Sequence, residues 1–492
     1  MKGEIIMKFK SNDEINKECM ELLNEDKDIW KNNFHFDSPL GLINDPNGLS
    51  FYNGEYYIFF QWNPYGCEHN YKHWGYIKTK DFINFKYPNV FISPDSWYDK
   101  NGCYSGSAIV KDNILNLVYT GNVKDPEGNR ESYQCLATLS NEDEVKKLGP
   151  IINEIPNGYT AHFRDPYIFE KDEKYYIVIG AQNKKLQGRA LMYSSIDFNE
   201  WILEGEINSK YKDFGFMWEC PSLFQINGLD ILAISPQGLK KEELKYQNIY
   251  QSGYMIGNLN YENLNYNHGE FKEFDSGFDF YAPQIFKDIN DRTIMIGWMG
   301  LPETEDCHIT SKYGWMHSLT MPRELFIKDG ILYQSPIKEF KELREEKLVC
   351  LENIETDHLN INNIESNSYE MILSLNRGES NEVNISFMKD DNGEVSLVYN
   401  FDTEICTLSR VKCNSNGIEE RKFKLYIKDS LKINMFVDKS AVEIYFGDGE
   451  EVASLRIYNG DEATGLSIES KKENLKINSI NIWKMGEVKY YE

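Results

Sequence analysis

Asn44-Asp45-Pro46-Asn47-Gly48 stands shortly before an apolar and aromatic run at residues 54–62. Pro46 fixes one backbone angle and favours an extended conformation for the residue before it. Gly48 permits a tight bend. Together they would hold the Asp45 side chain rigidly at the start of a strand. An ordinary turn is the alternative, because Asn, Asp, Pro and Gly dominate turns, and the rest of the chain decides between the two.

The same arrangement recurs about every 60 residues, which indicates a repeat architecture. A short motif precedes each strand-like run, and each unit has room for about four short strands, the size of one propeller blade. We therefore predict an all-β chain in which residues 31–334 form a five-bladed β-propeller. The motifs contribute Asp45, Asp165 and Glu219, which we expect to meet at the mouth of the central channel. The runs that follow the motifs span residues 56–61, 115–120, 175–181, 229–235 and 293–299.

The segments on either side of the repeats differ from them. A capping-box pattern at residues 11–14 predicts a short helix within an N-terminal helical arm, residues 1–30. Residues 335–350 are predicted to form a helical connector, because their apolar side chains fall on one side. Short strand-like segments then predict a C-terminal β-sandwich over residues 351–492. We see no catalytic constellation there.

Composition narrows the function classes. The net charge of −25 disfavours nucleic acid and anionic membranes as partners. Nine scattered cysteines indicate reduced thiols, and the N-terminus lacks the apolar core of a signal peptide, so we predict a cytoplasmic enzyme. Asp306, His308 and His317 match no standard ligand spacing, so we predict no metal site. The oligomeric state is not predictable from these features.

Three acidic motifs resemble those of the invertase and fructan-hydrolase family of glycosidases, glycoside hydrolase family 32. They are Asn-Asp-Pro-Asn-Gly at 44–48, Arg-Asp-Pro at 164–166 and Glu-Cys-Pro at 219–221. The resemblance extends from about residue 30 to the end. It is strongest to the bacterial branch of the family that acts on sucrose 6-phosphate. Further landmarks occur in family order at residues 104–108, 162–166, 179–182, 217–221, 235–238, 281–284, 296–299 and 438–445.

The resemblance implies hydrolysis of a β-fructofuranosidic bond with retention and without a cofactor. Asp45 would attack the anomeric carbon, and Glu219 would protonate the leaving oxygen and later deprotonate water. Asp165 would stabilise the transition state through ring hydroxyls. Retaining glycosidases hold their two reacting carboxyl groups about 5–5.5 Å apart. The apolar sequence neighbours of Glu219 suit a general acid, because apolar surroundings disfavour the charged carboxylate.

Sugars present apolar C–H faces and hydroxyl edges, which suit aromatic rings and amides. His69 and Lys72 are predicted to contact a substrate phosphate, because cations near the pocket would offset its charge. Ordinary core packing is the alternative for each tryptophan, and a structural ion pair is the alternative for Arg164. The predicted sugar contacts are Asn44, Gln61, Trp62, Trp74, Tyr104, Ser105, Arg164 and Trp298.

Several other functions stay open. The chain could hydrolyse inulin- or levan-type fructans, or act as a general invertase without a phosphate preference. An inverting pentosidase would hold its acids about 6.5–9.5 Å apart, but the ordered landmarks argue against it. A non-catalytic sugar-binding propeller would more often have lost one of the acids, and all three are present.

Overall fold

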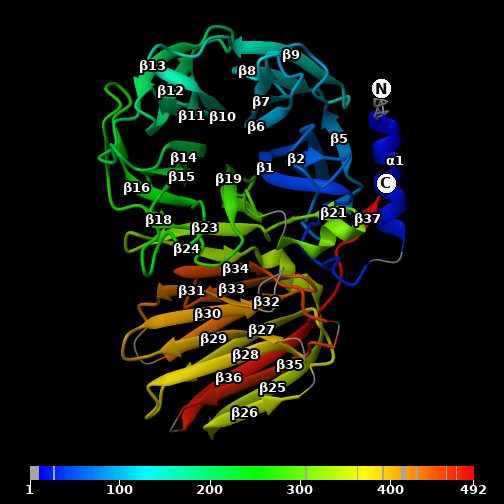
Figure 1. Ribbon diagram of the computed structural model, residues 1–492, viewed down its shortest axis with the longest axis vertical. Coiled ribbons are helices and arrows are strands. Elements are labelled where there is room, and N and C mark those ends of the chain that lie inside the picture. Colours follow the sequence, from blue (N-terminus) through cyan, green and yellow to red (C-terminus); the bar gives the residue numbers. More distant parts are fainter. Residues whose placement is uncertain are drawn as a thin grey trace.

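The computed structural model describes residues 10–25, 28–304, 307–362, 364–390, 393–411, 417–427, 430–460, 462–471 and 474–492. Within these residues the chain is mainly β-strand, in five sheets from its N-terminal part and two from its C-terminal part. In Figure 1 the five sheets surround a centre and the other two lie below them. The predicted all-β class is confirmed. No helix in the described part is long and apolar enough to cross a membrane.

The five N-terminal sheets are mainly antiparallel meanders, and each collects strands that mostly follow one another in sequence. The first sheet also has two parallel pairs, β1 with β21 and β4 with β37. The first comprises β1 (Gly41–Tyr52), β2 (Glu55–Asn63), β3 (His73–Thr79), β4 (Asn84–Lys86), β5 (Asn89–Ile92), β21 (Trp315–Met316) and β37 (Lys489–Tyr491). The second comprises β6 (Cys103–Lys111), β7 (Ile114–Lys124), β8 (Arg130–Leu139) and β9 (Val145–Ile152). The third comprises β10 (Tyr159–Lys171), β11 (Lys174–Asn183), β12 (Gly188–Ser195) and β13 (Ile202–Glu206). The fourth comprises β14 (Met217–Ile226), β15 (Leu229–Gln237), β16 (Gly253–Leu259), β17 (Tyr266–His268) and β18 (Lys272–Glu273). The fifth comprises β19 (Tyr281–Lys287), β20 (Thr293–Met299), β22 (Ser318–Leu319), β23 (Arg323–Lys328) and β24 (Ile331–Pro336).

The first strands of these sheets, β1, β6, β10, β14 and β19, contact one another in a closed cycle. Each carries a break in register near the same point of its sheet. A bulge leaves a residue outside the hydrogen-bond ladder, so proline, which has no N–H to donate, is tolerated there. Each break includes at least the first residue of one of five dipeptides, which we call the bulge doublets: Asp45-Pro46, Ser105-Gly106, Asp165-Pro166, Cys220-Pro221 and Ala282-Pro283.

The bulge doublets hold unusual backbone conformations. Asp165, Cys220 and Ala282 have φ values of 64°, 46° and 47°. Residues with side chains rarely adopt the left-handed region, and such strained positions concentrate at functional sites. The ring of bulges therefore marks the end of the cycle where a site is expected.

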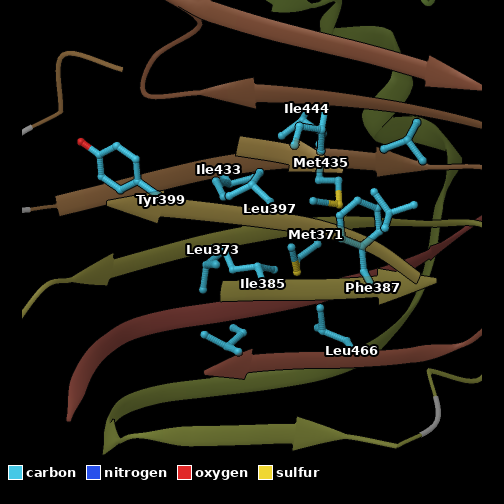
Figure 2. Close-up of a cluster of buried hydrophobic side chains, with 14 of the residues drawn as sticks. Met371, Leu373, Ile385, Phe387, Leu397, Tyr399, Ile433, Met435, Ile444 and Leu466 are labelled. Atoms are coloured by element: carbon cyan, nitrogen blue, oxygen red, sulfur yellow. The ribbon is translucent and has the colours of Figure 1, made fainter. Parts of the chain in front are cut away.

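The C-terminal part is a β-sandwich of two six-stranded antiparallel sheets. Figure 2 shows Met371, Ile385, Leu397 and Met435 between the layers, and all four are fully buried. Along several strands buried residues alternate with less buried ones, as expected when one face of a sheet covers a core. One sheet comprises β25 (Arg344–Thr356), β36 (Leu475–Met485), β27 (Tyr369–Asn376), β32 (Ser430–Val437), β33 (Ala441–Phe446) and β34 (Glu451–Arg456). The other comprises β26 (His358–Ile361), β35 (Gly465–Ser470), β28 (Glu382–Asp390), β29 (Gly393–Asn400), β30 (Ile405–Val411) and β31 (Ile418–Lys424).

The helical segments are short. Helix α1 (Asn12–Asn24) begins with the predicted capping box, in which the Ser11 side chain accepts from the Glu14 N–H. A 3-10 helix, η2, spans Ile309–Tyr313. The predicted helical connector over residues 335–350 is wrong in extent: a 3-10 helix, η3 (Lys338–Leu343), is followed at once by β25. Apolar residues every three positions suit a 3-10 helix, and β25 pairs with β36 along its length.

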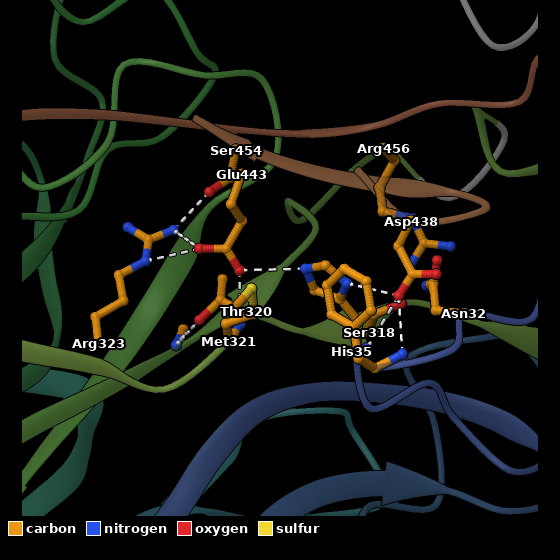
Figure 3. A network of polar contacts seen from close by, with 12 residues as sticks. Asn32, His35, Ser318, Thr320, Met321, Arg323, Asp438, Glu443, Ser454 and Arg456 are labelled. Atoms are coloured by element: carbon orange, nitrogen blue, oxygen red, sulfur yellow. Dashed lines mark hydrogen bonds and ion pairs between the residues drawn. The ribbon is translucent and has the colours of Figure 1, made fainter. Parts of the chain in front are cut away.

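A buried ionic network joins the ring of sheets to the sandwich, and Figure 3 shows it. The Arg323 Nε on β23 donates to the Glu443 Oε2 on β33 at 2.9 Å. His35 lies between the two sandwich acids: its Nδ1 is 3.0 Å from the Asp438 Oδ2, and its Nε2 is 3.3 Å from the Glu443 Oε1. All four side chains are fully buried. We call these four residues the junction network.

Candidate active site

A cavity of about 810 Å³ lies at the bulged end of the strand cycle. Every one of the five first strands contributes to its wall, because the residue directly before each bulge doublet lines it. The cavity also contains all three predicted acids, Asp45, Asp165 and Glu219. The five residues that precede the doublets are Asn44, Tyr104, Arg164, Glu219 and Tyr281.

Asp45 is held by hydrogen bonds to both carboxylate oxygens. The Asn44 Nδ2 donates to its Oδ1 at 3.0 Å, and the Ser105 hydroxyl donates to its Oδ2. The Cys220 thiol lies 3.7 Å from the same Oδ2. Burial raises the pKa of Asp45 above its usual value, while the bonds from Ser105 and Asn44 oppose that rise.

Glu219 is clamped from two sides. The Arg164 Nη2 donates to its Oε1 at 2.6 Å, and the Arg164 Nε donates to the same atom at 3.0 Å. The Tyr281 hydroxyl donates to its Oε2 at 2.7 Å. The expectation of apolar surroundings is therefore wrong. Trp218 points into the core instead, where its indole N–H donates to the Phe214 carbonyl, since neighbouring side chains on a strand face opposite ways.

Asp165 is near enough to the other two acids to interact with both of their charges. The Cys220 backbone N–H donates to its Oδ2 at 3.1 Å, and the Arg164 Nε lies 3.9 Å from that oxygen. Burial raises the pKa of Asp165 to about 7; Arg164 opposes the rise, and the charges of Glu219 and Asp45 add to it. Three carboxylates thus share a cavity in which Arg164 is the only cation within 4 Å of two of them, among the residues that the structure describes.

Some of the predicted sugar contacts line the cavity, and others lie away from it. Trp62 and Trp74 do not line the cavity; both are fully buried, so their prediction as sugar contacts is corrected to core packing. Their indole N–H groups donate to the carbonyls of Leu40 and Tyr104. Ser105 is buried beneath Asp45 and does not line the cavity. The predicted contacts in the cavity wall are Asn44, Gln61, Tyr104, Arg164 and Trp298.

The two predicted phosphate ligands differ from each other. His69 is exposed at the cavity wall, with its ring 5.7 Å from the ring of Trp298. Lys72 also lines the cavity but is only 4% exposed, and its ammonium donates to the Asn44 Oδ1. Lys72 therefore lies in the cavity wall, as expected for a phosphate contact, but its ammonium is held beside Asn44 and not at the exposed rim.

Tyr281 is the main site residue that the sequence interpretation did not assign. The sequence pattern could have predicted it, because Tyr281 precedes Ala282-Pro283 just as Glu219 precedes Cys220-Pro221. Of the three residues considered for a metal site, Asp306 lies outside the described residues. His308 and His317 are buried side chains whose rings lie 4.5 Å apart. Among the residues described, no group of three or more His, Cys, Asp or Glu side chains could hold a metal ion.

Relatives of known sequence and structure match nearly the whole chain. A sucrose-6-phosphate hydrolase of Bacillus subtilis (strain 168) is 39% identical over 470 residues, 93% of this chain and 94% of that protein. The solved sucrose-6-phosphate hydrolase from Lactobacillus gasseri is 31% identical, with a TM-score of 0.86 over 97% of each chain. A β-fructofuranosidase from Bombyx mori is 27% identical, with a TM-score of 0.82 over 98% of this chain and 99% of that one.

Two family models divide the chain between them. The model of the glycosyl hydrolases family 32 N-terminal domain matches residues 35–336, which contain the cavity and all strands of the five sheets except β37. The model of the family 32 C-terminal domain matches residues 339–484, which contain the sandwich. With these matches and the 39% identical relative, the chain belongs to glycosyl hydrolases family 32.

Proposed function

We propose that this protein is a retaining β-fructofuranosidase that hydrolyses sucrose 6-phosphate in preference to sucrose. Relatives named for sucrose 6-phosphate hydrolysis, which cover nearly the whole chain, support the substrate. The observation that carries the chemistry is the convergence of Asp45, Asp165 and Glu219 in one cavity. Glycoside hydrolysis commonly needs two carboxyl groups, one for each side of the scissile bond.

In the proposed mechanism, Asp45 attacks the anomeric carbon of the fructosyl unit while the bond to the leaving oxygen breaks. Protonated Glu219 gives its proton to that oxygen, so the first product leaves as an alcohol. Glu219, now a carboxylate, takes a proton from water, whose oxygen attacks the same carbon and releases Asp45. Inversion occurs twice, so the configuration is retained.

The surroundings of Asp45 and Asp165 support their proposed roles, and Glu219 is held in place by its neighbours. Asp45 accepts from Asn44 and Ser105, which favours the ionised nucleophile. Asp165 lies beside both other acids, where its charge would stabilise the positive charge that develops on the sugar ring. Arg164 and Tyr281 fix the Glu219 carboxyl group in the cavity wall.

The architecture that we propose has one propeller blade for each of the five N-terminal sheets, with residues 31–334 as catalytic domain and 351–492 as sandwich. The five meanders and the closed cycle of first strands support this blade count. We also propose that His69 contacts the phosphate, because its imidazole is an exposed hydrogen-bonding group of the cavity wall. A cytoplasmic location stays a prediction.

The test is release of reducing sugar from four substrates: sucrose, sucrose 6-phosphate, inulin and levan. We expect the highest kcat/KM on sucrose 6-phosphate. Proton NMR of the first-released fructose should show the β-anomer, which is the mark of retention. A preference for inulin or levan would instead make the protein a fructan hydrolase, and binding without turnover would make it a sugar-binding propeller.

A further inference from the structure

We infer that Lys72 is a positioning residue that sets the direction of a closed hydrogen-bond ring around Asp45. This inference rests on the proposed role of Asp45 as nucleophile. It replaces the phosphate contact that the sequence suggests for Lys72. The ring is built from side chains of three strands, and its members are Asn44 and Asp45 on β1, Gln61 on β2 and Ser105 on β6.

The ring closes through four hydrogen bonds. The Asn44 Nδ2 donates to the Asp45 Oδ1 at 3.0 Å and to the Gln61 Oε1 at 3.0 Å. The Gln61 Nε2 donates to the Ser105 hydroxyl oxygen. The Ser105 hydroxyl then donates to the Asp45 Oδ2. Lys72 lies outside the ring and donates to the Asn44 Oδ1.

Lys72 can fix this direction because an ammonium group only donates hydrogen bonds, whereas amides and hydroxyls both donate and accept. The Asn44 atom that faces Lys72 must therefore be its oxygen. The Asn44 NH₂ group must then face Asp45 and Gln61, so Gln61 presents its oxygen to Asn44 and its NH₂ group to Ser105. That leaves the Ser105 proton for Asp45, which receives a donor at each oxygen.

The ring is shielded and anchored. Lys72, Asn44, Gln61 and Ser105 are all at least nine-tenths buried, so water competes little for these bonds. The Lys72 carbonyl accepts from the Cys103 N–H at 2.8 Å, which ties its backbone to the start of β6. Burying a lysine ammonium costs free energy, and an apolar residue would fill the same space better. Packing alone therefore does not explain Lys72.

The consequence for Asp45 is one orientation, with a hydrogen-bond donor at each oxygen. These donors favour the ionised carboxylate over the protonated acid. The positive charge of Lys72 acts in the same direction, and it opposes the burial and the neighbouring Glu219 charge that raise the pKa of Asp45. The titratable and charged groups around Asp45 are Glu219, Asp165, Cys220, Tyr281 and Lys72.

The experiment compares Lys72→Met with wild type on sucrose and sucrose 6-phosphate. A misdirected nucleophile loses kcat whatever the leaving group, so we expect kcat to fall about 10- to 100-fold on both substrates. The acid limb of kcat/KM against pH should move to higher pH, because a cation beside Asp45 is gone. A phosphate contact would instead raise KM for sucrose 6-phosphate alone, and that result would overturn the inference.

A second measurement tests whether Lys72 acts through Asn44. Lys72→Met added to an Asn44→Leu enzyme should lower kcat no more than about twofold further, because the ring is already broken. Losses that multiply in the double variant would overturn the inference. If Lys72→Met fails to fold, Lys72→Gln serves: its amide can donate or accept, so it no longer imposes a direction, and unchanged kcat would contradict the inference.

Lys78 provides the matched control. It lies on β3, which begins directly after Lys72, is 8% exposed, and pairs with Asp143 at 3.4 Å outside the cavity wall. Lys78→Met should keep kcat within about twofold of wild type, since it removes an equally buried cation from outside the ring. An inactive wild type, or an active Asp45→Asn variant, refutes the proposed function. If the wild type is active, Asp45→Asn is inactive and Lys72→Met keeps the full kcat, only the inference about Lys72 is refuted.

Discussion

Asp45 and Asp165 of the cavity and the two acids of the junction network are all largely buried, yet their pKa values move in opposite directions. Burial raises the pKa of Asp165 to about 7 and also raises that of Asp45. Burial would raise the pKa of Glu443 too, but Arg323 and His35 outweigh it and lower the pKa to about 2. Asp438 is likewise lowered against burial, chiefly by its hydrogen bond to His35.

The difference lies in the partners. In the junction network each carboxylate has a cationic side chain within about 3 Å, so folding favours its charge. In the cavity, Asp45 accepts from neutral groups, and Arg164 is shared between the other two acids. Carboxylates without a cationic partner of their own suit a site that must stabilise a cationic transition state. Carboxylates paired with cations suit an interface between two parts of a fold.

The largest effect that we expect is the loss of activity in Asp45→Asn. The amide is nearly isosteric but is not a nucleophile, so kcat should fall about 10⁴-fold or more. The unfolding midpoint should change little, because the substitution loses a hydrogen bond to Asn44 or Ser105 but also removes a buried charge. Steady-state assays on sucrose 6-phosphate, with circular dichroism melting of the same samples, check both halves. Activity near that of wild type would remove Asp45 from its proposed role.

The junction network should respond in the opposite way. Glu443→Gln leaves Arg323 and His35 buried without their shared acid, so the free energy of unfolding should drop by about 3–5 kcal/mol. Well below the melting temperature, kcat should stay within about twofold of wild type, because the cavity is not touched. Denaturant unfolding measures the first quantity. Unchanged stability would show that the network does not hold the two parts together.

Glu219→Gln tests whether Glu219 protonates the leaving group, because substrates whose leaving groups need little protonation should be affected less. On sucrose, kcat should fall about 10²- to 10⁴-fold, the usual contribution of general acid catalysis. On a fructoside with a nitrophenolate leaving group the loss should be smaller, because that group departs with little protonation. Azide should rescue the variant when a covalent intermediate accumulates. Equal losses on both substrates, with the first step rate-limiting, would exclude Glu219 as the acid.

The sequence predicts those features of the site that depend on neighbouring residues in one strand, and not those that depend on tertiary packing. The bulge doublets are local, because proline or glycine at a fixed period marks the same backbone break in each sheet. They identify the first strands and bring Asp45, Asp165 and Glu219 together. Whether Trp62 faces the cavity or the core depends on which sheet packs against it, and strand periodicity alone does not specify that.

Contacts between residues far apart in the sequence are also not predictable from it. His35 contacts Asp438, which lies 403 positions further along the chain. Lys72 contacts Asn44 across a strand and a loop, so the sequence places Lys72 near the cavity but does not reveal its partner. Both are buried charges whose partners are fixed only by tertiary packing.

His35 should give the junction network a characteristic pH dependence. Burial would lower its pKa, but the bonds to Asp438 and Glu443 raise it to about 9. Because the folded value lies above the unfolded one, its contribution is fully present below about pH 6.5 and is lost as pH rises to about 9. His35→Gln should therefore be less stable than wild type by about 1–3 kcal/mol at pH 6 and by much less at pH 9.5. A difference that does not change with pH would exclude a charged His35.

The smallest effect that we expect belongs to the cavity and has the opposite sign. The folded pKa of Asp165, about 7, lies above its usual value of 3.8, so wild-type stability should decline as pH rises from about 4 to 7 and then level off. Asp165→Asn carries no charge and escapes this decline. It should be more stable than wild type by about 0.5–2 kcal/mol at pH 8, with little or no advantage at pH 4. Its activity should be strongly reduced at both pH values. Thermal melts of the two proteins across this range measure the difference. If Asp165→Asn were less stable at pH 8, the carboxylate would be compensated as in the junction network, and the contrast between the two clusters would not hold.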